Sequence, residues 1–249
     1  MDAAIRQFVE ERQPDALLVS GDLTQRARPE QFQATRRFLD SLSLPKVVVP
    51  GNHDVPLWSV HERLFNPLGR WRRWFSPETE PTLKLPGLWV YGINTAKGLT
   101  LKNGSFRESS LARMRSFFAD SPADTFRMVV AHHHLTPAVR TFYDPVAGRA
   151  HAAAKALATS RVDLVVSGHL HHGFLRSLPE HYGGLDYPTR VLHSGTSMSS
   201  RGRWEEAERN SMNWIDMDGT SVRISRLQHV SDATFVEQEQ HVWPRPIGL

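Results

Sequence analysis

The sequence predicts an α/β fold in which two mixed β-sheets pack together and helices cover the outside. Short, continuous apolar runs alternate with helical patterns along most of the chain, which is typical of a sheet covered on both faces. Beyond residue 189 the apolar and polar residues alternate without intervening helices, which predicts a second, more antiparallel sheet. No repeat, linker or change in composition divides residues 1–249, so we expect a single domain.

The elements follow one another in a regular order. Helical spacing of apolar residues predicts a helix over residues 1–12, and Pro29 suits the first turn of a second helix. Further helices are expected at residues 109–118 and at the alanine-rich segment 150–158. The predicted strands are residues 16–19, 46–49, 88–93, 126–131, 163–166, 190–193, 213–216 and 221–224.

Composition excludes several classes of protein. The 249 residues contain no cysteine, which excludes a disulfide scaffold, a thiolate metal site and a cysteine nucleophile. No apolar run approaches the roughly 20 residues that span a bilayer, and the first residues lack the apolar core of a signal peptide. We therefore expect a cytoplasmic protein. Lys and Arg outnumber Asp and Glu by 30 to 26, which suits a phosphate-bearing substrate but also fits scattered surface charge.

Side chains of the metal-binding type follow four predicted strands. In open α/β sheets the carboxyl ends of the strands line one crevice, so these side chains are expected to converge. Glycine precedes three of the four groups and allows the backbone to turn sharply there. Oxygen and imidazole ligands without sulfur suit Mn²⁺, Fe, Zn²⁺ or Co²⁺. The residues concerned are Asp22, Asn52, His53, Asp54, His132, His133, His169 and His171.

The order and spacing of these motifs resemble the signature of the calcineurin-like metallophosphoesterases. The resemblance covers residues 15–200, and the segment 20–24 is most similar to bacterial members of the cyclic-nucleotide phosphodiesterase type. It implies a four-layer α/β/β/α fold with two divalent metal ions. It also implies hydrolysis of a phosphodiester or phosphomonoester, a cyclic nucleotide among them, by a metal-bound hydroxide. The motifs are Gly21-Asp22, Gly51-Asn52-His53-Asp54, His132-His133 and Gly168-His169-Leu170-His171.

The resemblance also implies a role for each residue. Asp22 matches the carboxylate that bridges both metals, and His171 matches a ligand of one of them. The other metal takes Asn52, His132 and His169. His53 matches the histidine that contacts the scissile phosphate and assists the leaving oxygen, and Asp54 beside it is expected to orient the ring. Two positions stay open for His133, one that supports the metal ligands and one that faces the substrate. His134 occupies a position at which many relatives have proline.

One part of the family pattern is missing. The family opens with an Asp-x-His motif on its first strand, and this sequence contains none. The chain begins inside the first predicted helix, so we expect a truncated start and a missing first strand. One metal would then keep only Asp22 and His171, and we expect about one bound ion and weakened catalysis.

Other functions remain open at this stage. A phosphate-ester small molecule is the expected partner, and nucleic acid is not, because the only cluster of basic and aromatic residues is segment 70–74. That segment either buries its two tryptophans as a surface helix, which we favour, or lies on a membrane as in a lipid-linked pyrophosphate hydrolase. A nuclease and a phosphate-binding remnant are further alternatives. The oligomeric state is not predicted.

Overall fold

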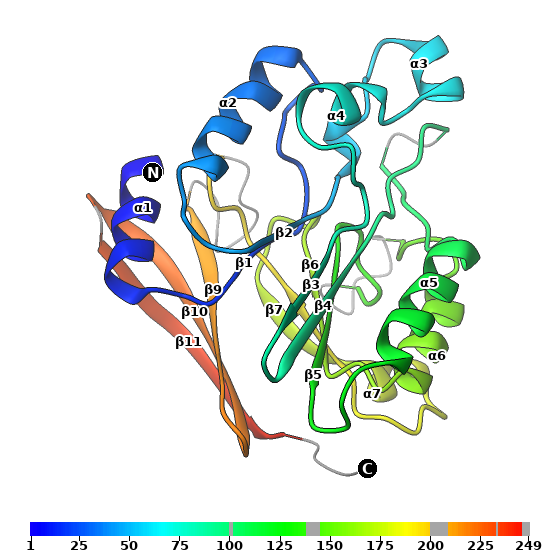
Figure 1. Cartoon of the computed structure of the whole chain (residues 1–249), viewed down its shortest axis with the longest axis vertical. Helices are drawn as coiled ribbons and strands as arrows, with labels where there is room; N and C mark the ends of the chain where they lie inside the picture. Colours follow the sequence, from blue (N-terminus) through cyan, green and yellow to red (C-terminus); the bar gives the residue numbers. More distant parts are fainter. Residues whose placement is uncertain (100–101, 138–144, 200–208, 233, 246–249) are drawn as a thin grey trace.

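The computed structural model describes residues 1–99, 102–137, 145–199, 209–232 and 234–245. A six-stranded sheet in the order β3-β4-β5-β6-β8-β7 forms its centre (Figure 1). The four inner strands are parallel, and the two edge strands are antiparallel to their neighbours. The strands are β3 Thr82–Leu85, β4 Leu88–Ile93, β5 Phe126–Ala131, β6 Leu164–Ser167, β7 Phe174–Ser177 and β8 Arg190–His193.

Alternate side chains of this sheet enter two different cores. Val129 and Ala131 of β5 face helices α5 (Glu108–Ala119), α6 (Ala150–Thr159) and α7 (Leu178–Tyr182). Met128 and Val130 of the same strand face a second sheet, where they join Val222 in another buried cluster. Because successive side chains of a strand point to opposite faces, a continuous apolar run is what a doubly covered sheet requires.

The second sheet is antiparallel and is covered by the first helix. Its order is β11-β10-β9, with β9 at Ser211–Met217, β10 at Ser221–Ser231 and β11 at Thr234–Pro244. Helix α1 (Asp2–Arg12) packs Phe8 edge-on against Trp214 and Phe235. The layers are therefore helices, sheet, sheet and helix, which confirms the expected four-layer architecture (Figure 1).

A short parallel pair stands beside the central sheet. Strands β1 (Leu17–Val19) and β2 (Lys46–Val48) have three residues each and flank helix α2 (Pro29–Asp40). Beyond β2 lie a 3₁₀ turn, η1 (Asn52–Asp54), and helices α3 (Val60–Phe65) and α4 (Gly69–Trp74). This part of the chain has its own buried cluster around Phe32 and Trp71.

The expected helices and strands are found close to their predicted positions, and the bounds of β4 and β5 are as predicted. One assignment was wrong. Residues 190–193 were expected in the antiparallel sheet, but β8 pairs in parallel with β6 inside the central sheet. Its three residues after Arg190 are buried, which suits an interior strand. None of the helices described is long and apolar enough to cross a membrane.

Candidate metal centre

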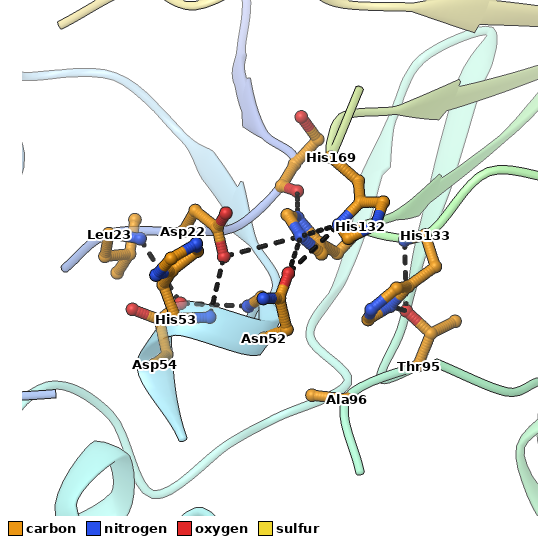
Figure 2. A network of polar contacts seen from close by, with 12 residues as sticks. Asp22, Leu23, Asn52, His53, Asp54, Thr95, Ala96, His132, His133 and His169 are labelled. Atoms are coloured by element: carbon orange, nitrogen blue, oxygen red, sulfur yellow. Dashed lines mark hydrogen bonds and ion pairs between the residues drawn. The ribbon is translucent and has the colours of Figure 1, made fainter. Parts of the chain in front are cut away.

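Four of the predicted ligands meet where β1, β2, β5 and β6 end. Figure 2 shows Asp22, Asn52, His132 and His169 pointing toward one another. The Nε2 atom of His132 lies 3.0 Å from Asn52 Oδ1, 3.2 Å from His169 Nδ1 and 3.4 Å from Asp22 Oδ1. The Nδ1 atom of His169 also lies 3.0 Å from Asn52 Oδ1. Residues up to 147 positions apart in the sequence thus form one compact group of potential ligands.

Glycine is required where the loops approach one another. A Cβ atom on Gly21 would lie 2.7 Å from His132 Nδ1, and one on Gly51 would lie 2.1 Å from Asp22 Oδ1. Gly21 also has a φ of 98°, a conformation that side chains with a Cβ rarely adopt. The sharp turns that the sequence predicted after these strands therefore bring the ligand-bearing loops into direct contact.

Three of the predicted ligands have left-handed backbone conformations. Their φ angles are 58° at Asp22, 73° at His169 and 56° at His171. Such angles are uncommon outside glycine and cost of order 1 kcal/mol or more per residue. The surrounding structure holds these residues in strained turns, a property that is frequent at functional sites.

The hydrogen bonds of His132 make this group suitable for a cation. Its Nδ1 atom lies 2.7 Å from the carbonyl oxygen of Ser20, which can only accept, so Nδ1 carries the proton. When the ring carries no second proton, the lone pair of Nε2 points toward Asn52 Oδ1, which is also an acceptor. A positive ion between these atoms converts mutual repulsion into attraction, and the donor set therefore fits a divalent metal.

Burial favours the neutral form of the other histidine. Desolvation lowers the pKa of His169, and the neighbouring histidines, His132 first, lower it further. A neutral imidazole is the form that binds a metal ion. The ring of His134 stacks on that of His169, with centroids 5.6 Å apart. The site is thus preorganised for metal binding without the loss of a proton from His169.

Asp54 holds the two oxygen-bearing loops together. Its carboxylate accepts hydrogen bonds from the backbone N–H groups of Gly51 (2.9 Å), Leu23 (3.2 Å) and Thr24 (2.9 Å), and from the Thr24 hydroxyl (3.1 Å). Burial raises the pKa of Asp54 to about 7, and the charge of Asp22 adds to the increase. The sequence placed Asp54 as the residue that orients His53. The observed contacts give it a different position, because its oxygen atoms are directed at backbone amides.

His53 is oriented by a main-chain oxygen instead. Its ring Nδ1 lies 3.0 Å from the carbonyl of Gln25, and its backbone N–H donates to Asp22 Oδ1 at 3.0 Å. Because a carbonyl oxygen only accepts, Nδ1 carries a proton. The loop after β1 therefore fixes the ring of a residue that belongs to the loop after β2.

His133 has a structural partner at each ring nitrogen. Its ligand atoms lie within 4.8 Å of those of His132 and His169, so the three histidines form a potential metal-binding group. However, Nδ1 lies 2.8 Å from the Thr95 hydroxyl and Nε2 lies 2.9 Å from the Lys102 carbonyl. With Nε2–H donating to the carbonyl, Nδ1 accepts from Thr95, and the ring has no lone pair left for a metal. These two hydrogen bonds favour a supporting position for His133 over a substrate-facing one.

His171 has a hydroxyl group as a hydrogen-bonding partner. Its Nδ1 lies 2.9 Å from the hydroxyl of Thr196, in the segment after β8. It is near enough for its charge to lower the pKa of His169. Sequence reasoning missed the groups that orient the rings of His171, His132 and His53, namely Thr196 and the carbonyls of Ser20 and Gln25. Main-chain carbonyls leave no signal in a sequence.

Comparisons with known proteins agree with this geometry. The family model described as calcineurin-like phosphoesterase matches residues 1–173. A probable cyclic nucleotide phosphodiesterase of Synechococcus sp. is 26% identical over 235 residues, which cover 87% of this chain and 83% of the relative. A glycerophosphodiester phosphodiesterase of Enterobacter lignolyticus is 49% identical over 41 residues, 16% of this chain and 15% of the relative.

The solved structures show the same fold at low sequence identity. A dimetal phosphatase from Danio rerio superposes with a TM-score of 0.67 at 11% identity, covering 97% of this chain and 87% of that one. The likeness concerns the fold alone, while the match to the family model includes the segments that carry all eight candidate site residues. The chain therefore belongs to the calcineurin-like phosphoesterases, which hydrolyse phosphoric esters with the help of divalent metal ions.

Proposed function

We propose that this chain is a metal-dependent phosphodiesterase whose active site is the group of side chains around His132. The observation that carries the proposal is the convergence of Asp22, Asn52, His132 and His169 on one point, with separations of 3.0 to 3.4 Å around His132 Nε2. Two oxygen donors and two imidazole nitrogens are enough to hold one divalent ion of the Mn²⁺, Fe, Zn²⁺ or Co²⁺ type.

Asp22 has the central position in this proposal. Its carboxylate is the negative charge of the group, and its second oxygen is suited to an additional ion for which His171 is a further ligand. Among the described residues, that second ion has fewer donors than the first. We therefore expect one tightly held ion and one weakly held ion per chain. Bound ions supply charge neutralisation of the phosphate and activation of a water molecule.

His53 is the proposed catalytic residue that contacts the substrate. Its backbone is tied to Asp22 and its Nδ1 proton to Gln25, so the remaining ring nitrogen has a fixed direction. With Nδ1–H bound to Gln25, this nitrogen donates only when the ring carries a second proton; in that form it stabilises the departing oxygen by donating a hydrogen bond or the proton, an effect typically worth about 10²–10⁴ in rate. We assign Asp54 a positioning role, because it connects the loop that carries Asp22 to the loop that carries His53.

The names of the relatives favour a diester as substrate. One relative over most of the chain is named a cyclic nucleotide phosphodiesterase, and the short match is to a glycerophosphodiester phosphodiesterase. A cyclic nucleotide is accordingly the first substrate to test. The loops that select the alcohol groups lie outside the metal-binding strands, so the diester class is better supported than any single diester.

The test compares metal content with turnover. Purified protein, the Asp22→Asn variant and the His53→Ala variant are each loaded with Mn²⁺, and the bound ions are counted. Each is then assayed on bis-p-nitrophenyl phosphate, p-nitrophenyl phosphate and a cyclic nucleotide. We expect Asp22→Asn to lose both metal and activity, and His53→Ala to keep its metal but lose about 10²-fold or more in turnover.

Two outcomes would contradict the proposal. If His53→Ala loses metal and activity together, His53 is a ligand and not the residue that contacts the leaving oxygen. If the unaltered protein binds metal and phosphate but turns over none of the three esters, the chain is a phosphate-binding member of its family.

A further inference from the structure

An exposed apolar surface begins, in the sequence, a few residues after the metal-binding segment 52–54. Ten large hydrophobic side chains are exposed among the described residues, and six of them belong to two segments around helix α3. The exposed fractions are 81% for Trp58, 75% for Phe65 and 68% for Val60. We call this group the α3 surface; its members are Leu57, Trp58, Val60, Leu64, Phe65 and Leu99.

The two segments of the α3 surface are fixed to each other. A Cβ atom on Gly98 would lie 1.7 Å from the carbonyl oxygen of Arg63, so the loop that carries Leu99 packs closely on the helix. Helix α3 begins with a hydrogen bond from the Glu62 amide to the Ser59 hydroxyl and has no buried residue. It projects from the periphery of the molecule in Figure 1. Its apolar side chains therefore do not contribute to the protein core.

Positive charge surrounds these apolar side chains. Between residues 55 and 75 the sequence has four arginines and one acidic residue, the half-buried Glu62. Glu62 is already paired with Arg70, with a nitrogen-to-oxygen distance of 2.7 Å. Arg72 donates to the side chain of Asn66 at the end of α3, and Arg73 lies over the ring of Trp74. The net charge around the α3 surface is thus clearly positive.

We propose that the α3 surface binds an anionic phospholipid membrane. Aromatic and aliphatic side chains with flanking cations are the combination that inserts into the interface of such a membrane. The large exposed area of Trp58 and Phe65 suits the acyl boundary, and the arginines suit the phosphate headgroups. Because only residues 55–59 separate η1 from α3, binding in this manner would hold the metal centre close to the lipid surface.

Charge argues against a second copy of the chain as the occupant. A two-fold interface would place the α3 surface of one subunit on that of the other. The arginines would then face arginines, which costs free energy at a desolvated interface. An anionic membrane instead supplies the opposite charge over the whole surface.

Helix α4 contributes arginines to this charge, but its tryptophans are not the part that inserts into the membrane. The sequence offered segment 70–74 as a helix that lies on a membrane, or as one that buries its tryptophans. Trp71 is fully buried, its indole N–H donates to the carbonyl of Glu78, and it packs edge-on against Phe32. Its apolar face is therefore used inside the protein, whereas that of α3 is open to solvent.

The test is flotation with vesicles of phosphatidylcholine alone and of phosphatidylcholine with phosphatidylglycerol. We expect the unaltered protein to float with the mixed vesicles and to be released by high salt. The double variant Trp58→Ser and Phe65→Ser should bind at least about tenfold more weakly. The matched control replaces Val236 and Val242, which are 42% and 57% exposed on β11, with serine and should bind normally.

Quenching by brominated lipids locates the contact. These lipids should quench the tryptophan fluorescence of the unaltered protein, and most of this quenching should be absent in Trp58→Phe. Flotation that is unchanged in the Trp58→Ser and Phe65→Ser variant would overturn the proposal, as would a failure to bind either vesicle. If this variant instead abolishes a dimer in sedimentation velocity, the occupant is a second copy of the chain. All these readouts are independent of phosphoesterase activity.

Discussion

The two halves of the metal centre come from regions with very different support. His132 and His169 follow β5 and β6, which have a hydrogen-bonded strand on each side and fully buried ends. Asp22 and Asn52 follow β1 and β2, a pair of three-residue strands whose side chains are in part half-buried. The first region is positioned by a sheet. The second depends on individual hydrogen bonds, chiefly those of Asp54, Ser20 and His53.

The two regions fix the positions of their metal ligands in different ways. In the central sheet, backbone ladders fix the strand ends before any side chain takes part. In the β1–β2 region, a single buried carboxylate replaces much of that ladder. Sensitivity to substitution should therefore be spread over many residues in the sheet and concentrated at Asp54 in the β1–β2 region.

The largest effect is expected from Asp54→Ala. The substitution leaves three backbone amides without their acceptor, and we expect a loss of roughly 3–4 kcal/mol in the free energy of unfolding. Urea denaturation of the metal-free protein measures it. The matched control is Asp218→Ala, because Asp218 also accepts from two backbone amides, those of Thr220 and Ser221, but in solvent. The control should lose far less stability than Asp54→Ala; equal losses would refute the special role of Asp54.

A second experiment makes the same substitution in both regions. Leu164 of β6 is fully buried, whereas Leu18 of β1 is only partly buried. We expect Leu164→Ala to cost about 3 kcal/mol and Leu18→Ala about 1 kcal/mol, since the cost follows the apolar area buried and the cavity left. Thermal and urea unfolding provide the values. A larger loss for Leu18 would mean that the short strands are better packed than their exposure indicates.

The smallest effect is expected from Thr95→Val. Valine keeps the shape but removes the hydroxyl that donates to His133 Nδ1 and accepts from the His133 amide. We expect a loss of about 1–2 kcal/mol in stability with the metal content unchanged, because His133 supports the centre without binding metal. Thr95→Ser, which keeps the hydroxyl, serves as the control. A drop in bound metal in Thr95→Val alone would instead identify His133 as a ligand.

The sequence was informative where regular backbone structure determines position. The ends of β5 and β6 follow from their apolar runs, so the neighbourhood of His132 and His169 could be predicted. The partners of Asp54 could not, because its hydrogen bonds are made to amides of a loop some 30 residues earlier in the chain. The strand β8 was misplaced for a related reason: four residues with a half-polar pattern do not reveal which sheet they join.

The left-handed backbones at Asp22, His169 and His171 set folding and function against each other. At each of these positions glycine would adopt the same φ without the steric cost of a Cβ atom. A library screened only for resistance to heat should therefore accumulate glycine there, whereas a library screened for hydrolysis should retain the strained residues. The positions at which the two screens disagree would then map the active site without any assumption about its metal or its substrate.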